Sequence, residues 1–268
     1  SQDIQGKAQT GQPEFTYNPD PNNGGADQAI QVSAQNPAKF VVDGAVTDAN
    51  QIDAKDKDGK VIGTYTLTPE TGLITFQPNK DFVGTPEPIQ VEVKDANGTP
   101  AKASYTPTVT AVVPRGDNQT TTDIQGKTQS ATLVFTPGAD KVPMDDTVDA
   151  TFEDGSTEKK VEGQGTYTVA KDGTVTFVPE KSFVGTATPV TVKRQDVNGT
   201  VATATYTPIV TAVTPSGSPA TSSGLQGASQ TGTPSFTPGH PDVPIKIDAD
   251  QPAQFVLAGK AVTETSIP

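Results

Sequence analysis

The chain of 268 residues has no cysteine and no tryptophan, and it has one histidine. Without cysteine it forms no disulfide, no zinc–thiolate site and no thiol nucleophile. The single histidine, His240, lies in the turn-like segment Pro238–Pro241, and no serine has the spacing of a nucleophile elbow or a catalytic triad. The paired carboxylates Asp145 and Asp146 fit a solvated loop. We therefore expect no enzyme, no catalytic residues and no cofactor.

Apolar and aromatic side chains are also scarce, at 32% and 6% of the chain. This balance favours several thin domains with small cores over one large core. We find no signal peptide, no transmembrane run and no wall-anchoring tail, so the sequence resembles an internal part of a longer protein. The net charge is −12, which makes nucleic acid and anionic membranes poor partners because both bind basic surfaces.

Internal repetition is the most informative feature that is present. The segment Gly63–Thr66 returns as Gly165–Thr168, at an offset of 102 residues. The segment Phe82–Thr85 returns as Phe183–Thr186, at an offset of 101 residues. The chain is therefore expected to contain copies of one structural unit of about a hundred residues.

The beginnings of the units repeat as well. Asp3–Lys7 matches Asp123–Lys127, and Leu225–Gly227 is a weaker third copy. The phenylalanines that follow these segments are 120 and then 101 residues apart, so the first unit carries 19 extra residues. We predict a first repeat with this insertion at 1–114, a linker at 115–122, a second repeat at 123–214, a linker at 215–223 and a truncated third repeat at 224–268.

The apolar residues within each unit alternate with polar ones. Ile74 and Phe76 flank Thr75, and Val175 and Phe177 occupy the same places in the second copy. A period of two residues indicates a strand with one buried face. No window has a helical period, so we predict an all-β fold of tandem, immunoglobulin-like β-sandwich repeats joined by short polar linkers. Phe76 and Phe177 are expected to be buried, either against Tyr65 and Tyr167 respectively or against the opposing sheet.

Turn residues separate the expected strands. Asn97-Gly98 and Asn198-Gly199 each lie between two alternating runs, and such a pair allows positive φ at both turn positions, which predicts a hairpin. Pro107 and Pro208 fall within the closing strand of each unit, where they favour an edge position or a bulge.

Several of these segments together resemble a known family. The residues concerned are Tyr167 with its flanking threonines, Val175–Thr186, Pro189–Arg194 and Ala204–Pro208. They are similar to the CshA-type fibril repeat, which forms the repetitive region of streptococcal wall-anchored surface adhesins. The resemblance covers essentially the whole chain. It implies an extracellular location on the wall of a Gram-positive bacterium and a fibril of many repeats, in which a separate N-terminal region binds host fibronectin.

Two functions are compatible with this resemblance. In the first, the repeats form a structural stalk that projects an adhesive tip from the cell wall, and their partners are the adjacent repeats of the same chain. In the alternative, the repeats themselves bind a host matrix protein, other cells or each other.

One tripeptide is a candidate partner contact. Arg115-Gly116-Asp117 resembles the motif that many integrin ligands use, and it falls in the first predicted linker, where we expect an exposed, flexible loop. The second linker has Ser216-Gly217-Ser218 in its place, so an ordinary solvated linker is the other interpretation.

Metal and covalent sites have weaker support. Asp56 and Asp58 could begin a calcium loop, but Lys60 and Leu67 stand where oxygen ligands are needed, so we assign no metal ligands. Asn97, Asn118 and Asn198 match the glycosylation pattern, although turn chemistry explains them. An intramolecular isopeptide bond needs a buried lysine. The aligned candidates are Lys7 and Lys127, with Ala228 in the third copy.

Overall fold

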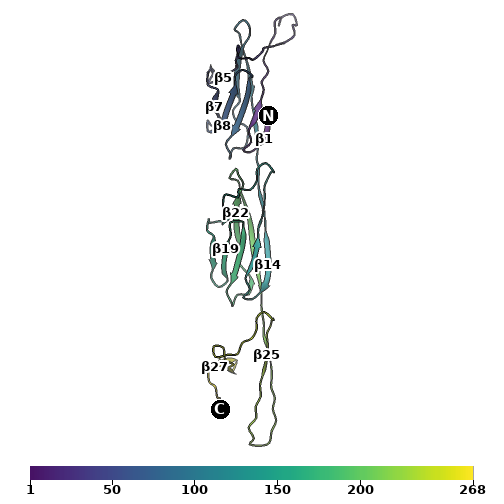
Figure 1. The fold of residues 1–268 in the computed structure, drawn as a ribbon, viewed down its shortest axis with the longest axis vertical. Coiled ribbons are helices and arrows are strands. Elements are labelled where there is room, and N and C mark those ends of the chain that lie inside the picture. Colours follow the sequence, from purple (N-terminus) through teal and green to yellow (C-terminus); the bar gives the residue numbers. More distant parts are fainter. Residues whose placement is uncertain (268) are drawn as a thin grey trace.

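The structure is a computed structural model that describes residues 1–267. Every regular element in this part of the chain is a β-strand. Figure 1 shows an elongated molecule in which two sheet-rich units follow one another along the long axis, with a less regular C-terminal segment below them. The predicted all-β, immunoglobulin-like sandwich fold is confirmed. Within residues 1–267 no helix is long and apolar enough to cross a membrane.

The first unit consists of two facing antiparallel sheets. One has the order β2-β9-β8-β7 and the other has the order β11-β10-β5-β6. The insertion adds the short hairpin of β3 and β4, and β1 pairs with β12 in parallel. The strands are β1 (Gln2–Ile4), β2 (Gln9–Gly11), β3 (Thr16–Tyr17), β4 (Gln28–Ala29), β5 (Lys39–Val42), β6 (Ala45–Val46), β7 (Gln51–Lys55), β8 (Val61–Thr68), β9 (Leu73–Pro78), β10 (Ile89–Lys94), β11 (Pro100–Tyr105) and β12 (Thr108–Thr110).

The second unit repeats this plan. One sheet has the order β15-β20-β19-β18, and the other has the order β14-β23-β22-β17 with β21 also on β23. Its strands are β13 (Arg115–Asp117), β14 (Gln119–Ile124), β15 (Gln129–Thr132), β16 (Val134–Thr136), β17 (Thr151–Phe152), β18 (Glu158–Val161), β19 (Gly165–Val169), β20 (Thr174–Pro179), β21 (Gly185–Thr186), β22 (Val190–Gln195) and β23 (Val201–Thr211).

An aromatic pair anchors the core of each unit. Phe76 and Phe177 are both fully buried, as predicted. Each lies opposite a tyrosine of the neighbouring strand, and the ring centroids are 5.1 Å apart for Tyr65–Phe76 and 4.5 Å apart for Tyr167–Phe177. A second tyrosine meets the first edge-on from the facing sheet, which ties the two layers together.

The predicted hairpins are present, but their turns differ in type from the expectation. Gly98 and Gly199 have φ values of 82° and 87°, whereas their preceding asparagines do not have positive φ. The glycine N–H bonds to the carbonyl of the aspartate three residues earlier, Asp95 or Asp196. Each turn is therefore a type I turn followed by a glycine in the left-handed conformation. The aspartate carboxylate accepts two backbone N–H groups, which stabilises the turn without a positive φ at the asparagine.

The closing strands of the two units differ at their prolines, Pro107 and Pro208. In the first unit β11 ends at Tyr105 and β12 begins at Thr108, so the closing strand is interrupted around Pro107. In the second unit the expected edge position is wrong, because β23 continues through Pro208 for 11 residues and lies between β14 and β22. The strand persists since β14 pairs with it over six residues across this point and the Pro208 carbonyl accepts the N–H of Ala187.

The segment 115–122, predicted as a linker, is largely strand. Its residues form β13, which pairs with β16, and most of β14, which pairs with β23. A polar segment without apolar alternation can still be a strand when its backbone groups bond to a neighbouring strand that is distant in the sequence. Between β12, which ends at Thr110, and β13, which begins at Arg115, the chain forms no strand.

The C-terminal segment contains only short hairpins. Its strands are β24 (Ser216–Ser218), β25 (Ser235–Thr237), β26 (Phe255–Leu257) and β27 (Lys260–Val262), and each pairs only with its sequence neighbour. No residue from 214 to 267 is buried, and Phe236 and Phe255 are 48% and 46% exposed. Pro268, the last residue of the predicted third repeat, lies outside the described residues.

The core position of Phe177 leads to a first prediction. Phe177→Ala removes a fully buried ring and leaves a cavity beside Tyr167, so it should lower the free energy of unfolding of the second unit by about 3–5 kcal/mol. Val178→Ala, at a neighbouring site that is 52% exposed, is the control and should change it by less than about 0.5 kcal/mol. Urea denaturation measures both; a loss below about 1 kcal/mol for Phe177→Ala would remove that residue from the core.

The exposure of the C-terminal segment leads to a second prediction. Residues 224–267 should exchange their amide hydrogens with solvent faster than residues 124–211, because few of their backbone groups lie under packed side chains. Hydrogen exchange followed by mass spectrometry measures this difference, and limited proteolysis should cut the same segment first. Equal protection of the two segments would contradict the predicted unit boundaries.

Candidate functional site

The distinctive feature of each unit is the pairing of its first and last strands. β14 runs parallel to the second half of β23, from Gln119 opposite Tyr206 to Ile124 opposite Thr211. In the first unit β1 runs parallel to β12 over three residue pairs. The strand that brings the chain into a unit is thus bonded to the strand that leads it out, and the two strands point the same way.

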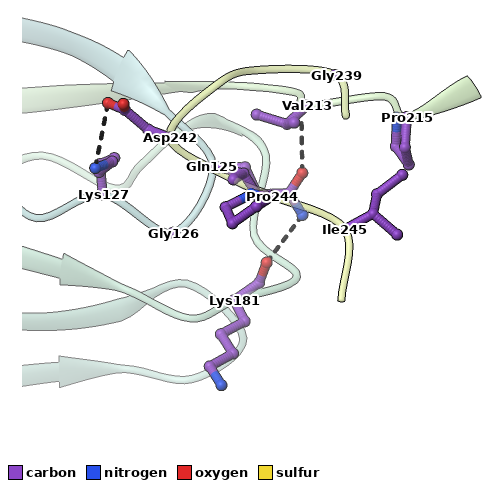
Figure 2. A pocket seen from close by; sticks show the side chains of 11 residues that line it. Gln125, Gly126, Lys127, Lys181, Val213, Pro215, Gly239, Asp242, Pro244 and Ile245 are labelled. Atoms are coloured by element: carbon purple, nitrogen blue, oxygen red, sulfur yellow. Dashed lines mark hydrogen bonds and ion pairs between the residues drawn. The ribbon is translucent and has the colours of Figure 1, made fainter. Parts of the chain in front are cut away.

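A repeated glutamine secures the end of this pairing. The Gln125 N–H donates to the Thr211 carbonyl at 2.8 Å, and its side-chain amide donates to the Lys181 carbonyl at 2.9 Å. Its side-chain oxygen accepts the N–H of Val213 at 3.3 Å. Figure 2 shows the two side-chain bonds as dashed lines. Gln5 makes the same three contacts in the first unit, which explains the recurring Asp-Ile-Gln-Gly-Lys segment.

A second glutamine lies under the parallel strands. Gln129 is buried, and its side-chain amide donates to the Ile209 carbonyl at 2.9 Å. Thr121 donates its hydroxyl to Gln129 at 2.5 Å, so the Tyr206 hydroxyl, 2.7 Å away, must donate to Thr121. In the first unit Ser1, Gln9 and Tyr105 make an equivalent network.

The tyrosines of this region stay protonated. Burial raises the pKa of Tyr206, while its hydrogen bond with Thr121 acts in the opposite direction. Burial likewise raises the pKa of Tyr167, with a smaller contribution from the nearby Tyr206. A protonated Tyr206 can donate its hydrogen bond throughout the physiological pH range, so the network gives structural stability and offers no general base.

The two units meet at a small polar junction. The Asn198 side chain, at the tip of the β22–β23 hairpin, donates to the Gln5 carbonyl at 3.0 Å. The Lys80 ammonium of the first unit donates to the Val197 carbonyl at 3.1 Å.

The charge of Lys80 also acts on a carboxylate of the second unit. The pKa of Asp145 is lowered mainly by hydrogen bonds from Thr147, and the charges of Lys80 and Arg194 lower it further.

The second unit has a cavity at its other end, toward the C-terminal segment. It has a volume of about 580 Å³ and is open to solvent. Figure 2 shows Asp242–Ile245 crossing it, with the Lys127 ammonium 3.4 Å from the Asp242 carboxylate. Its lining includes Gln125, Gly126 and Lys181, which are the counterparts of the junction residues of the first unit.

The tripeptide predicted as a partner contact does not lie in a flexible loop. Arg115-Gly116-Asp117 is strand β13, and Gly116 packs so closely on the Thr203 backbone that a Cβ there would clash with it. The Arg115 guanidinium is 3.4 Å from the Asp117 carboxylate, and both side chains are partly exposed. The expectation of a mobile loop is therefore corrected, while partner binding by these residues stays a prediction.

The other candidate residues have local structural contacts. The Asp56 carboxylate accepts the N–H groups of Asp58 and Lys60 in the turn between β7 and β8. Among residues 1–267 no three acidic, histidine or cysteine side chains are placed to hold a metal ion. Lys127, considered for an isopeptide bond, has a side chain that is 43% exposed and pairs with Asp242. The His240 Nδ1 accepts the N–H of Asp242 within its turn.

Sequence reasoning missed the glutamines and the junction. Gln5 and Gln125 stood inside a repeat that had been noticed, so their recurrence was the available signal. Their role depends on partners that are 56 to 107 residues away, and no local pattern identifies these.

Comparison with known families decides the identity. The repetitive domain of the surface adhesin CshA matches at residues 1–109, 111–210 and 212–268. The chain belongs to this family. It is therefore an adhesin repeat region, and its place is at the cell surface. The family resemblance predicted from the sequence is confirmed, and the three matches follow the repetition of the sequence.

Solved structures add further similarity. Repeat domain 13 of the fibrillar adhesin CshA from Streptococcus gordonii is 64% identical, covers 26% of this chain and 90% of its own, and has a TM-score of 0.17. A tetra-tandem repeat from the extending region of a large adhesion protein is 18% identical over 71% of this chain and 46% of its own, with a TM-score of 0.25. Drosophila N-cadherin EC1-3 is 14% identical over 70% and 59%, with a TM-score of 0.28. Among curated proteins, none matches the chain.

The buried glutamine network of the adhesin repeats yields a third prediction. Gln129→Ala removes the acceptor of the Thr121 hydroxyl and the side-chain donor to the Ile209 carbonyl in a part-buried site, so it should lower the free energy of unfolding by about 1–3 kcal/mol. Gln230 is its sequence counterpart in the third copy and is exposed, so Gln230→Ala should have no measurable effect. Thermal unfolding followed by circular dichroism compares the variants. Equal effects at both positions would show that burial of the network does not matter.

Proposed function

We propose that these repeats form a load-bearing stalk that holds an adhesive region away from the bacterial cell wall to which the protein is anchored. The observation that carries the proposal is the parallel pairing of an opening strand with the last strand of each unit, β1 with β12, and β14, which follows the short β13, with β23. We further propose that the chain divides into units at about residues 114 and 214, so that β13 opens the second unit. Within the stalk, the partners of a repeat are its neighbours, and it has no enzymatic role.

The pairing determines how tension acts on a unit. After the short β13, the chain reaches β14 at Gln119, beside Tyr206, and it leaves the second unit after Thr211, beside Ile124. Tension between the two ends therefore pulls β14 and β23 in opposite directions along their length. All the hydrogen bonds between the two strands are loaded together, in shear, and none is opened alone. A unit built in this way resists unfolding under an axial load.

The distribution of polar and apolar groups supports a spacer over a binding module. The net charge of −12 keeps neighbouring fibrils apart and soluble. The buried apolar side chains of the two complete units lie mainly in two internal clusters, one between the sheets of each unit. Units arranged in a line, as Figure 1 shows, also give a stalk a large length for its number of residues.

Single-molecule force spectroscopy tests this proposal, which is the fourth prediction. Pulling through the chain ends loads β14 and β23 in shear, whereas pulling between Thr122→Cys and Thr211→Cys separates the same strands from one end. The chain has no other cysteine, so the attachment points are unique. We expect a higher unfolding force for the second unit in the first geometry. Equal forces, or saturable binding of the purified chain to host matrix proteins, would contradict the stalk.

A further inference from the structure

The two ends of a unit carry features that fit each other. At the junction, the hairpin Asp196–Thr200 of the second unit rests against the turn Ile4–Lys7 of the first unit. The Asn198 side-chain amide donates to the Gln5 carbonyl at 3.0 Å, and the Lys80 ammonium donates to the Val197 carbonyl at 3.1 Å. Neither bond belongs to the sheets of either unit. These bonds act only between the units.

The glycine of the turn makes room for this hairpin. Gly6 has a φ of 79°, and a Cβ atom at this position would collide with the Asn198 side chain. Gly126 has a φ of 81° in the same turn of the second unit, and nothing lies within 4 Å of its Cβ position. Both turns need glycine for their backbone conformation. At Gly6 alone, the missing side chain also leaves space for the neighbouring unit.

Two valines next to the junction residues are also buried, since Val112 bonds to Gln5 through its N–H and Val142 precedes Pro143, whose carbonyl accepts the Val197 N–H. Val112 and Val142 are 3% and 0% exposed, yet neither belongs to the core of a unit. Their counterparts at an offset of 101 residues, Val213 and Val243, line the open cavity at the other end of the second unit, and Val243 is 37% exposed. These valine positions are thus buried where the first unit meets the complete second unit. The equivalent positions line an open cavity where the second unit meets the C-terminal segment.

Both surfaces recur along the chain. The hairpin Asp95–Thr99 has the same turn, with the Asp95 carboxylate accepting the N–H groups of Asn97 and Thr99. The cavity is lined by Gln125, Gly126 and Lys181, which correspond to Gln5, Gly6 and Lys80. The third copy of the sequence reaches residue 268 before the counterpart of the Asp196–Thr200 hairpin.

We propose that the Gln-Gly turn and its nearby lysine form a docking surface for the Asp-x-Asn-Gly hairpin of the following repeat, and that this contact fixes the angle between units. The asparagine is the residue that determines the fit. Gln125, Gly126 and Lys181 form the same surface for the hairpin of a complete third repeat, and the Asp95–Thr99 hairpin fits such a surface on another unit. This inference deepens the proposed stalk and rests on it, because a stalk keeps its reach only if its joints resist bending.

Spin-label distance measurements on the whole chain test the contact, which is the fifth prediction. Gln90→Cys in β10 and Thr168→Cys in β19 place one label on an exposed strand position in each unit, and the native chain has no cysteine. With the junction intact, the distance distribution should be narrow. Gly6→Ala should widen it at least about twofold, because domains joined by a small interface move freely once its contacts are lost.

Matched variants separate the junction from the turn. Gly126→Ala introduces the same backbone strain as Gly6→Ala but meets open space, so the width should stay as in the native chain. Asn198→Ala removes the inter-unit donor and should widen the distribution, while Asn97→Ala, in the equivalent exposed hairpin, should not. The melting temperature of each variant verifies that both units remain folded.

Two results would overturn the inference. One is an unchanged width for Gly6→Ala and Asn198→Ala, and the other is equal widening by Gly126→Ala or Asn97→Ala. Either result would leave the force measurement on β14 and β23 unaffected, because that measurement concerns strands within one unit. Conversely, a weak second unit or binding to host matrix would contradict the stalk without changing the geometry of the junction.

Discussion

The structure depends on the parallel pairing of an opening strand with the last strand in each unit, β1 with β12 and β14 with β23. In the first unit β1 and β12 form a two-stranded sheet of their own, and in the second unit β14 is the edge strand beside β23. In both units the pairing places the end of the incoming strand beside the start of the next connection. The two repeated glutamines act on it, since Gln125 ties its end to the loop at Lys181 and Gln129 supports it from below. Without the closing strand these groups have no partners.

The same constraint sets the arrangement of the units. Because the entering and leaving strands run in one direction, the chain enters a unit at one end and leaves at the other. The two complete units then follow one another in a line, as Figure 1 shows, and the first presents its turn at Gln5 to the Asn198 hairpin of the second. In the stalk that we propose, this arrangement of the unit ends gives length and resistance to axial load.

The two complete copies show which parts of the repeat can vary. The aromatic pair, the aspartate-capped hairpin and the glutamine contacts occur in both units. The inserted hairpin of β3 and β4 and the break at Pro107 occur only in the first. The shared features are those that close the sandwich or terminate it. Of the variable features, the β3–β4 hairpin is exposed to solvent, whereas Pro107 at the break is buried.

The sequence by itself determined the repeats, the all-β fold and the buried faces. Alternation around Phe76 and Phe177 indicated their burial because a strand places every second side chain on the same face. It did not determine that Arg115–Asp117 is a strand, nor that Asn198 contacts Gln5 across 193 residues. The alternation of apolar and polar residues shows which side chains are buried. A polar segment that pairs through its backbone leaves no comparable pattern in the sequence. Only the closed tertiary structure decides which edges and ends of the units meet.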